Sequence, residues 1–409
     1  MTMHVWKILT ISFLCPILLL PADFNKAKDA STQDYRKMAR AYTKFGFDLY
    51  SKIVQARSDE NILTSPASVA IALAMTYNGA AGETERAMAT TLGLGDIDLQ
   101  EVNDANKSLI SELEKAIEKV ELNIANSLWA RKGLSFKQDF LSGNERYFGA
   151  DVSFLDFTDH ASPSVINGWV KEKTKGKIDE IVNSIAGDAI LFLINAIYFK
   201  GSWTKEFDKE KTKEEPFHVP GGTTKKIPMM RQSGNYLYLE NSDFQAISLP
   251  YGDKRMSMFV FLPAKEANLK AFHESLTAEN WATWMAGFHM RDGQILLPRF
   301  KIEFETKLKD VLIDLGMGDA FHSRRADFSR MITHPEENAY IHDVIHKTFA
   351  EVNEEGTEAA AVTSVEMRLT SVQVREEPFR MVVDRPFFFA IRDSRTGLVL
   401  FTGSVVNPS

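Results

Sequence analysis

The sequence predicts one α+β domain in which helices and strands are mixed along the whole chain. Of its 409 residues, 44% are hydrophobic and 25% are charged, which is typical of a globular protein with a large apolar core. No long linker, low-complexity segment or repeat divides the chain. Helical and strand periodicities alternate irregularly instead of occupying separate blocks, and this favours a single mixed unit.

The N-terminus is predicted to be a secretory signal peptide covering residues 1–22, with its boundary no later than about residue 30. Lys7 precedes an almost unbroken apolar run from Ile8 to Leu20, and Pro21-Ala22 follow it. The run is short for a membrane span, so an uncleaved anchor is the less favoured alternative. We expect secretion to the extracellular space, or to the periplasm if the source is bacterial, and no membrane contact after cleavage.

Charge and cysteine content exclude several classes of function. The net charge of −7 offers no global basic excess for nucleic acid or an anionic membrane. Cys15 is the only cysteine and lies inside the predicted signal peptide, so we expect no disulfide and no thiolate chemistry in the mature chain. Asn106-Lys107-Ser108 matches a glycosylation acceptor, which matters only in a glycosylating host.

Two helices are predicted near the start of the mature chain. Met38 to Val54 carries apolar residues at helical spacing. Ser65-Pro66 begins a second helix, because serine caps a helix well and proline fits the first helical position. Asn78-Gly79 ends it. The residues between are apolar on nearly every side, so we expect this helix to be buried.

The later elements are predicted in the same way, from periodicity and from turn residues. Val102 to Val120 is predicted to be an amphipathic helix, and Ile190 to Phe199 a strand covered on both faces. Ile295 to Phe304 is predicted to be a strand weakened by Pro298, and Leu308 to Leu315 a helix ended by Gly316. Pro386 to Val406 is predicted to form two strands around a turn.

Motifs of enzymes and metal sites are not found. The nine histidines form no His-Glu-x-x-His pattern, and neither a Gly-x-Ser-x-Gly nucleophile nor a phosphate-binding loop is present. Residues around His342 and His346 alternate as in a strand, which would place the two rings roughly 13 Å apart, too far to share an ion. No feature turns Ser65, Ser68 and His346 into a hydrolytic site. We predict no enzymatic activity, no metal and no cofactor.

The segment from Glu351 to Glu377 has an unusual pattern. An acidic turn ending at Gly356 is followed by small residues without proline until Pro378. From Thr357 onward every second residue is uncharged, and the side chains of this set are small at first and become bulky towards Leu369. The residues between them carry the charges. This predicts a half-buried strand. The order of sizes suits a strand that enters between two others; a permanent strand with an alanine-rich start remains the alternative.

The run from Glu351 to Ala361 resembles the hinge of the reactive-centre loop in inhibitory serpins. Several further segments resemble the family in chain order: Asn61 to Ala80, Asn195 to Trp203 with Phe207, Leu297 to Lys301, Ala326 to Ser329, Asp384 to Phe389, and Val405 to Pro408. The resemblance covers roughly residue 35 to the end.

The resemblance implies a serpin fold over residues 35–409, a single domain with three β-sheets, about eight or nine helices and an exposed reactive-centre loop at residues 356–377. It implies a suicide inhibitor of a serine protease, with a cysteine protease as the alternative target class. The inhibitor would be a monomer that forms a covalent 1:1 complex. We expect weak or no glycosaminoglycan binding, because acidic residues alternate with the lysines in Val102 to Val120.

Family roles transfer to matching positions. The hinge is Glu354, Gly356, Thr357, Glu358, Ala359, Ala360, Ala361 and Val362. The cluster that gates opening of the central sheet is Ser65, Ser68, Asn195 and His346. Trp203 marks the breach, where the loop would first enter.

The family's spacing past the hinge glycine places the scissile bond at Thr370-Ser371, which suits elastase-like or subtilisin-like proteases. Cleavage after Arg368 or Arg375 would instead select a trypsin-like enzyme. A non-inhibitory serpin, acting as carrier or chaperone, is the other alternative, although such members usually have bulky, charged or proline-bearing hinges.

Overall fold

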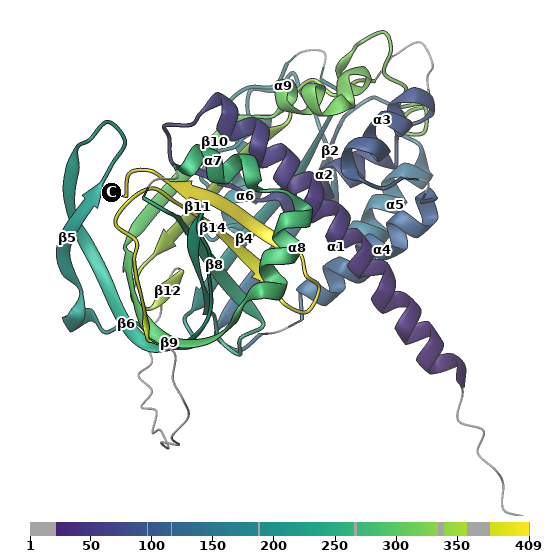
Figure 1. Ribbon diagram of the computed structural model, residues 1–409. Helices are drawn as coiled ribbons and strands as arrows, with labels where there is room; N and C mark the ends of the chain where they lie inside the picture. Colours follow the sequence, from purple (N-terminus) through teal and green to yellow (C-terminus); the bar gives the residue numbers. More distant parts are fainter. Residues whose placement is uncertain are drawn as a thin grey trace, which may run out of the picture.

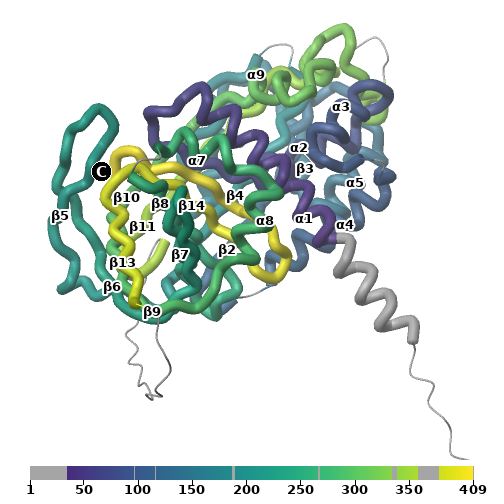
Figure 2. Tube along the Cα trace, viewed as in Figure 1, coloured from purple at the N-terminus to yellow at the C-terminus, as the bar shows by residue number. Residues whose placement is uncertain are grey.

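The computed structural model describes the backbone of residues 22–95, 97–115, 117–186, 189–265, 268–333, 339–357 and 377–408, and side chains from Tyr35 onward. Helices cover one end and one face of two β-sheets (Figure 1). Figure 2 shows that α3, α4 and α5 gather at one end of the molecule, and that β5, β6, β9 and β13 lie at the other.

Nine α-helices lie in the described residues, and none of them is both long and apolar enough to cross a membrane. They are α1 (Ala22–Ala56), α2 (Pro66–Tyr77), α3 (Gly82–Leu92), α4 (Leu99–Leu113), α5 (Gln138–Phe148), α6 (Ser162–Lys173), α7 (Leu269–Ser275), α8 (Ala278–Gly287) and α9 (Lys309–Leu312).

The smaller sheet contains six strands, of which one is only two residues long. Its order is β10 (Phe300–Lys307), β11 (Ile345–Val352), β12 (Gly356–Thr357), β4 (Leu191–Ser202), β2 (Val120–Arg131) and β3 (Asp151–Leu155). The pairs are antiparallel except for the parallel pair of β2 with β3.

The larger sheet contains nine strands. Its order is β1 (Ile62–Thr64), β15 (Val399–Val405), β14 (Phe387–Asp393), β8 (Met256–Pro263), β7 (Phe244–Pro250), β6 (Thr224–Glu240), β9 (His289–Pro298) and β13 (Phe379–Val382), with β5 (Lys213–His218) also paired to β6.

Hydrogen bonding therefore joins the described strands into two sheets where three were expected. The reason is the length of β6. Its first part pairs with β5 and its middle with β9, while its last three residues, Tyr238 to Glu240, pair with β7. One strand thus belongs to both halves of the larger sheet and connects them.

The buried second helix is confirmed. The Ser65 side chain accepts a hydrogen bond from the Ser68 N–H, and Pro66 occupies the first helical position. Eleven of the twelve residues of α2 are buried. The helix packs on α1, β4 and β15, so it lies between the two sheets and can transmit a movement of β4 to the core.

Two boundaries differ from those expected. The helix expected over Val102 to Val120 ends at Leu113, because Val120 already pairs with Gly201 and begins the long β2–β4 ladder. The single strand expected over Ile295 to Phe304 is two strands in different sheets. The β6–β9 ladder runs through Pro298, and the Arg299 N–H adds one more bond to Pro228. From Phe300 onward the chain pairs with β11 in the other sheet.

The acceptor pattern at Asn106 is not available to a glycosyltransferase in the folded protein. The Asn106 side chain is fully buried on α4. Its amide donates to the Val102 carbonyl at 2.9 Å and accepts from the Tyr42 hydroxyl at 2.8 Å. Both functional groups of the amide are therefore occupied inside the core.

We predict that folded protein secreted by a glycosylating host carries no glycan on Asn106, because a glycan cannot fit in this buried site. Intact-mass analysis before and after glycosidase treatment measures this directly. Glycosidase treatment should leave the mass of an Asn106→Gln variant unchanged, just as it leaves the mass of the wild type unchanged. A glycan found on Asn106 in monomeric, folded protein would contradict the packing described here.

Candidate functional site

The two-residue strand β12 lies between β11 and β4. Thr357 pairs with Val352 of β11 and with Gly201 of β4, and Gly356 pairs with Ser202. Among the described residues, no backbone pairing joins β11 to β4 directly. The first two residues of the expected loop are therefore already part of the sheet, between β11 and β4.

Gly356 is placed so that only glycine fits. A Cβ atom at this position would lie 2.0 Å from the carbonyl oxygen of Gly201 and 2.7 Å from the Cα of Ser202. Real Cβ atoms do not approach backbone this closely, so any side chain would push β12 away from β4. The absence of a side chain is what allows the chain to turn into the sheet here.

Thr357 points inward, as its parity predicted. The side chain is buried, and its hydroxyl lies 2.6 Å from the hydroxyl of Tyr251. Tyr251 in turn stacks on Trp203, with ring centroids 4.4 Å apart. Sequence analysis did not identify Tyr251, which follows β7 and carries no motif of its own.

Trp203 fixes the turn that precedes β12. Its indole N–H donates to the carbonyl of Asn353 at 2.9 Å, and its backbone N–H donates to the carbonyl of Glu355 at 2.9 Å. The residue predicted to mark the breach thus contacts the hinge through both side chain and backbone. Core packing and hinge contact are both present at this position.

Glu354 is the charged centre of the hinge. Its side chain is only 2% exposed. Arg299 donates to one carboxylate oxygen through Nε at 2.8 Å and Nη2 at 2.5 Å, and Thr212 donates to the same oxygen at 2.6 Å. Burial alone raises the pKa of Glu354, but the hydrogen bonds from Arg299 and Thr212 outweigh it, and the net pKa is lowered.

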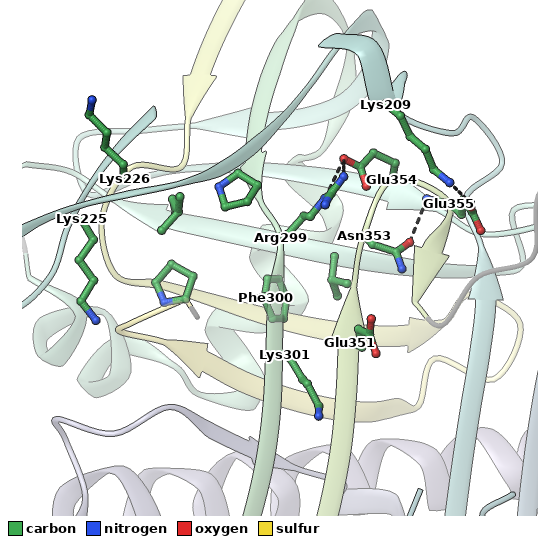
Figure 3. Close-up of a pocket in the computed structure, with 14 residues that line it drawn as sticks. Lys209, Lys225, Lys226, Arg299, Phe300, Lys301, Glu351, Asn353, Glu354 and Glu355 are labelled. Atoms are coloured by element: carbon green, nitrogen blue, oxygen red, sulfur yellow. Dashed lines mark hydrogen bonds and ion pairs between the residues drawn. The ribbon is translucent and has the colours of Figure 1, made fainter. Parts of the chain in front are cut away.

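Figure 3 shows the Arg299–Glu354 contact together with a second ion pair, Lys209 with Glu355, on the next residue of the hinge. The contacts of Arg299, Thr212 and Lys209 with the two hinge carboxylates are not predictable from local sequence patterns. Arg299 stood in a segment that resembled the family, but nothing in the sequence placed it next to Glu354, 55 residues away.

Ser65, Ser68, Asn195 and His346, the residues predicted to gate the sheet, form one connected set of hydrogen bonds, which uses the backbone of Asn195 and not its side chain. The Ser65 N–H donates to Nε2 of His346 at 2.9 Å, and the Ser65 hydroxyl donates to the Leu400 carbonyl at 2.8 Å. Ser68 reaches Asn195 only through the backbone, donating to its carbonyl at 3.3 Å. The Asn195 side chain donates instead to Asn126, at 2.6 Å, a residue that sequence analysis did not identify.

His346 is neutral in the folded protein. It lies on β11, where alternate residues are buried as predicted, and it accepts a backbone N–H. Burial lowers its pKa to about 4. His273 is also buried, contacts the Ser404 hydroxyl at 2.8 Å, and has its pKa lowered to about 4 by burial. His342, by contrast, is exposed and precedes β11.

Several predicted residues lie outside the described residues. These are the signal peptide up to residue 21, the hinge positions Glu358, Ala359, Ala360, Ala361 and Val362, the candidate scissile residues Thr370 and Ser371, and the alternatives Arg368 and Arg375.

A family model described as "Serpin (serine protease inhibitor)" matches residues 40–408. The chain belongs to the serpin family. Leukocyte elastase inhibitor of Xenopus laevis is 36% identical over 382 residues, which cover 91% of this chain and 99% of the relative. The native structure of the thermophilic serpin tengpin is 34% identical, with a TM-score of 0.82 and coverage of 91% of this chain and 94% of tengpin. Human thyroxine-binding globulin, solved with its hormone, is 28% identical, with a TM-score of 0.83 and coverage of 92% and 100%.

Family membership confirms the expected fold class and places the chain among proteins that mostly inhibit proteases and are not enzymes. In this serpin, the residues predicted to form the hinge, the breach and the gate lie around the place where β11, β12 and β4 meet. The hinge ion pairs lie at one end of that junction, and the His346 cluster lies farther along β11.

We predict that this serpin loses stability as the pH falls from about 6.5 towards about 4. His346 and His273 bind protons in the unfolded chain at pH values where the folded chain excludes them, so the free energy of unfolding decreases in this window. At pH 5, each histidine should cost on the order of 2 kcal/mol. Thermal unfolding measured between pH 7 and pH 5 tests this.

His346→Gln should remove about half of that pH dependence, because His273 still contributes the rest. His342→Gln, at an exposed position, is the matched control. Equal slopes for the wild type and His346→Gln would contradict the assignment of a neutral buried imidazole.

We also predict that Arg299→Met destabilises the native state by about 1–3 kcal/mol, because it leaves the buried Glu354 carboxylate without its charged partner. Adding Glu354→Gln to this variant should recover part of the loss, since a buried amide costs less than a buried charge. Melting temperature is the readout. Lys301→Met, two residues further along and exposed on β10, is the control; the same loss in that control would rule out a special role for Arg299.

Proposed function

We propose that this serpin is a secreted, single-use inhibitor of a serine protease that traps the enzyme by inserting its cleaved loop into the smaller sheet. The observation that carries the proposal is the position of β12. Its two residues occupy a strand position between β11 and β4, which have no direct pairing with each other among the described residues. Gly356 and Thr357 thus form the first two residues of a further strand between β11 and β4.

The proposed reaction begins with ordinary proteolysis. The protease serine attacks the carbonyl carbon of Thr370, the peptide bond to Ser371 breaks, and the amine of Ser371 takes a proton and leaves. An ester between Thr370 and the protease remains. The loop, free at its new end, extends β12 from Thr357 onward and carries the protease with it, and the distorted active site cannot hydrolyse the ester.

New hydrogen bonds and apolar burial drive such an insertion, but ordering the loop costs a similar amount, so the native state must also hold strain that insertion relieves. Roughly ten or more new backbone hydrogen bonds contribute about 0.5–1.5 kcal/mol net each. Burial of Val365, Met367 and Leu369 adds about 1.5–3 kcal/mol apiece, and ordering the loop opposes this by about 1–2 kcal/mol per residue. The outcome depends on small inward residues near the hinge, because bulky ones would not pass between β11 and β4.

Secretion and domain limits are part of the proposal. The basic and apolar N-terminal segment supports a signal peptide at residues 1–22 and an extracellular or periplasmic location. The serpin domain then covers residues 35–409, and the loop covers residues 356–377. A 1:1 covalent complex formed by a monomer follows from the mechanism.

An elastase-like or subtilisin-like enzyme is the proposed target class, because Thr370 is uncharged and β-branched. The similarity to leukocyte elastase inhibitor supports this choice. Cleavage after Arg368 or Arg375 by a trypsin-like enzyme is the alternative. A carrier role, as the name of thyroxine-binding globulin indicates for that protein, finds less support, since the hinge here lacks bulky or proline residues.

The test mixes the protein with elastase-like, subtilisin-like and trypsin-like proteases. We predict a covalent complex that survives denaturing electrophoresis, and mass spectrometry of the released C-terminal peptide identifies the cleaved bond. Thr357→Arg should still be cleaved but should no longer trap the protease, because the guanidinium cannot occupy the buried site against Tyr251. Full trapping by that variant would refute the insertion mechanism, and Lys270→Arg, at an exposed position on α7, provides the control.

We predict that Thr370→Arg transfers inhibition to a trypsin-like enzyme, since such enzymes require a cation at the residue whose carbonyl they attack. Rates of complex formation with trypsin-like and elastase-like enzymes, measured on the wild type and the variant, give the result. Unchanged specificity would mean that the scissile bond lies elsewhere, and the peptide mass would then distinguish Arg368 from Arg375.

A further inference from the structure

Two exposed apolar side chains lie side by side at the start of β9. Leu237 of β6 and Met290 of β9 are directly opposite each other in the antiparallel ladder, so they share one face of the sheet. Their exposed fractions are 40% and 59%. The other exposed large hydrophobic side chains in the described residues, Phe154, Val165 and Ile313, each lie on a different element. We call the adjoining pair the apolar rim, because exposed apolar groups that adjoin one another are typical of binding surfaces.

The end of α8 marks the border of the apolar rim. Leu239 lies on the same face as Leu237, two residues farther along β6, and is half-buried beside Gly287, the last residue of α8. Beyond that point the described part of the chain leaves Leu237 and Met290 largely uncovered. Both strands lie at the lower edge of the molecule in Figure 1.

The loop leaves the larger sheet at the same end. β13 is parallel to β9, with Phe379 beside Gly293, so the residues before Phe379 run back towards the start of β9. Glu377 is held there, because Nη2 of Arg291 donates to its carbonyl at 3.1 Å. Arg291 and Met290 are consecutive and point to opposite faces of β9. The apolar rim and the Arg291–Glu377 contact therefore lie on the two faces of one strand end.

The length of the chain limits how far a bound protease can be from this end of the sheet. Six residues, 371–376, separate the bond proposed for cleavage from Glu377. A fully extended segment of this length reaches about 25 Å at most. A compact protease of about 230 residues is roughly 40–45 Å across. The face of an enzyme that surrounds the bond is therefore held close to the end of the sheet and is wide enough to extend over the apolar rim.

We propose that the apolar rim is a second contact for the target protease, which places an apolar surface beside its substrate cleft over Leu237 and Met290. The inference rests on the proposed inhibitory function and adds to it a contact outside the loop. The rim discriminates between proteases that share a preference at the cleaved residue, because a charged enzyme surface at this place would lose hydration without gaining a partner.

The experiment measures how the full secreted protein binds elastase-like, subtilisin-like and trypsin-like proteases whose catalytic serine is replaced by alanine, so that neither cleavage nor insertion occurs. Titration calorimetry gives the Kd. For the enzyme that binds most tightly, Leu237→Thr/Met290→Ser should weaken binding by about tenfold. The same ratio is expected at about 0.1 M and about 0.5 M salt, because the lost contact is apolar and is not screened.

The matched control is Phe154→Thr/Val165→Ser, which removes two similarly exposed apolar side chains from β3 and α6. It should bind within about twofold of the wild type. If the rim variant fails to fold, Met290→Lys alone, at the more exposed of the two positions, should weaken binding in the same direction.

The active enzymes are tested separately for a covalent complex, which distinguishes the two proposals. Trapping without any effect of the rim substitutions on affinity would refute the apolar rim alone. Binding that depends on the rim, without trapping, would support the rim and refute the inhibitory mechanism.

Four results would overturn the proposal. Three concern the inactivated proteases: no binding at all, equal affinity of the wild type and the rim variant, or equal weakening in the rim variant and the control. The fourth comes from sedimentation of the serpin alone. A dimer that the rim substitutions dissociate would make the rim an interface between two copies of this chain, whereas a monomer supports the proposal.

Discussion

The structure around the loop depends on one ion pair, between Arg299 of the β9–β10 connection and Glu354 of the hinge. Glu354 is almost fully buried, and an unpaired carboxylate at such a position would be expensive. Arg299 therefore determines where the chain can leave β11. Thr212 supplies a second hydrogen bond to the same oxygen, and Trp203 holds the neighbouring carbonyls of Asn353 and Glu355. With the turn fixed in this way, Gly356 is brought against Gly201 and begins β12.

A second polar contact controls the strands farther from the hinge. The N–H of Ser65, at the start of α2, needs an acceptor in a buried place, and the neutral ring of His346 provides it. This joins β11 to the helix that lies between the sheets, while Ser68 joins the same helix to β4. Any widening between β4 and β11 must therefore strain one of these two hydrogen bonds, although the apolar surface of α2 could itself slide at little cost.

Local signals in the sequence were sufficient for some elements and insufficient for others. Ser65-Pro66 predicted the start of α2, and alternation around His346 predicted β11, because caps and side-chain parity act over a few residues. The division of Ile295 to Phe304 into β9 and β10 was missed, since it depends on the change of partner from β6 to the distant strand β11. The partners of Glu354 were missed for the same reason: Thr212, Arg299 and the hinge are brought together only by sheet topology. The number of sheets followed from the length of β6, which local periodicity does not show.

The segment after α6 lies across the junction of β4 and β11. Its start is tied to β2, where Asn123 donates to the Lys173 carbonyl, and the Lys177 ammonium lies 5.0 Å from the ring centre of Phe349 on β11. The segment thus crosses from one side of the junction to the other. Thr174, Lys177 and Ile178 line one pocket together with Thr357 and residues of β4 and β11. In the proposed insertion, a strand lengthening from Thr357 would therefore meet this segment directly beyond the hinge and would have to displace it.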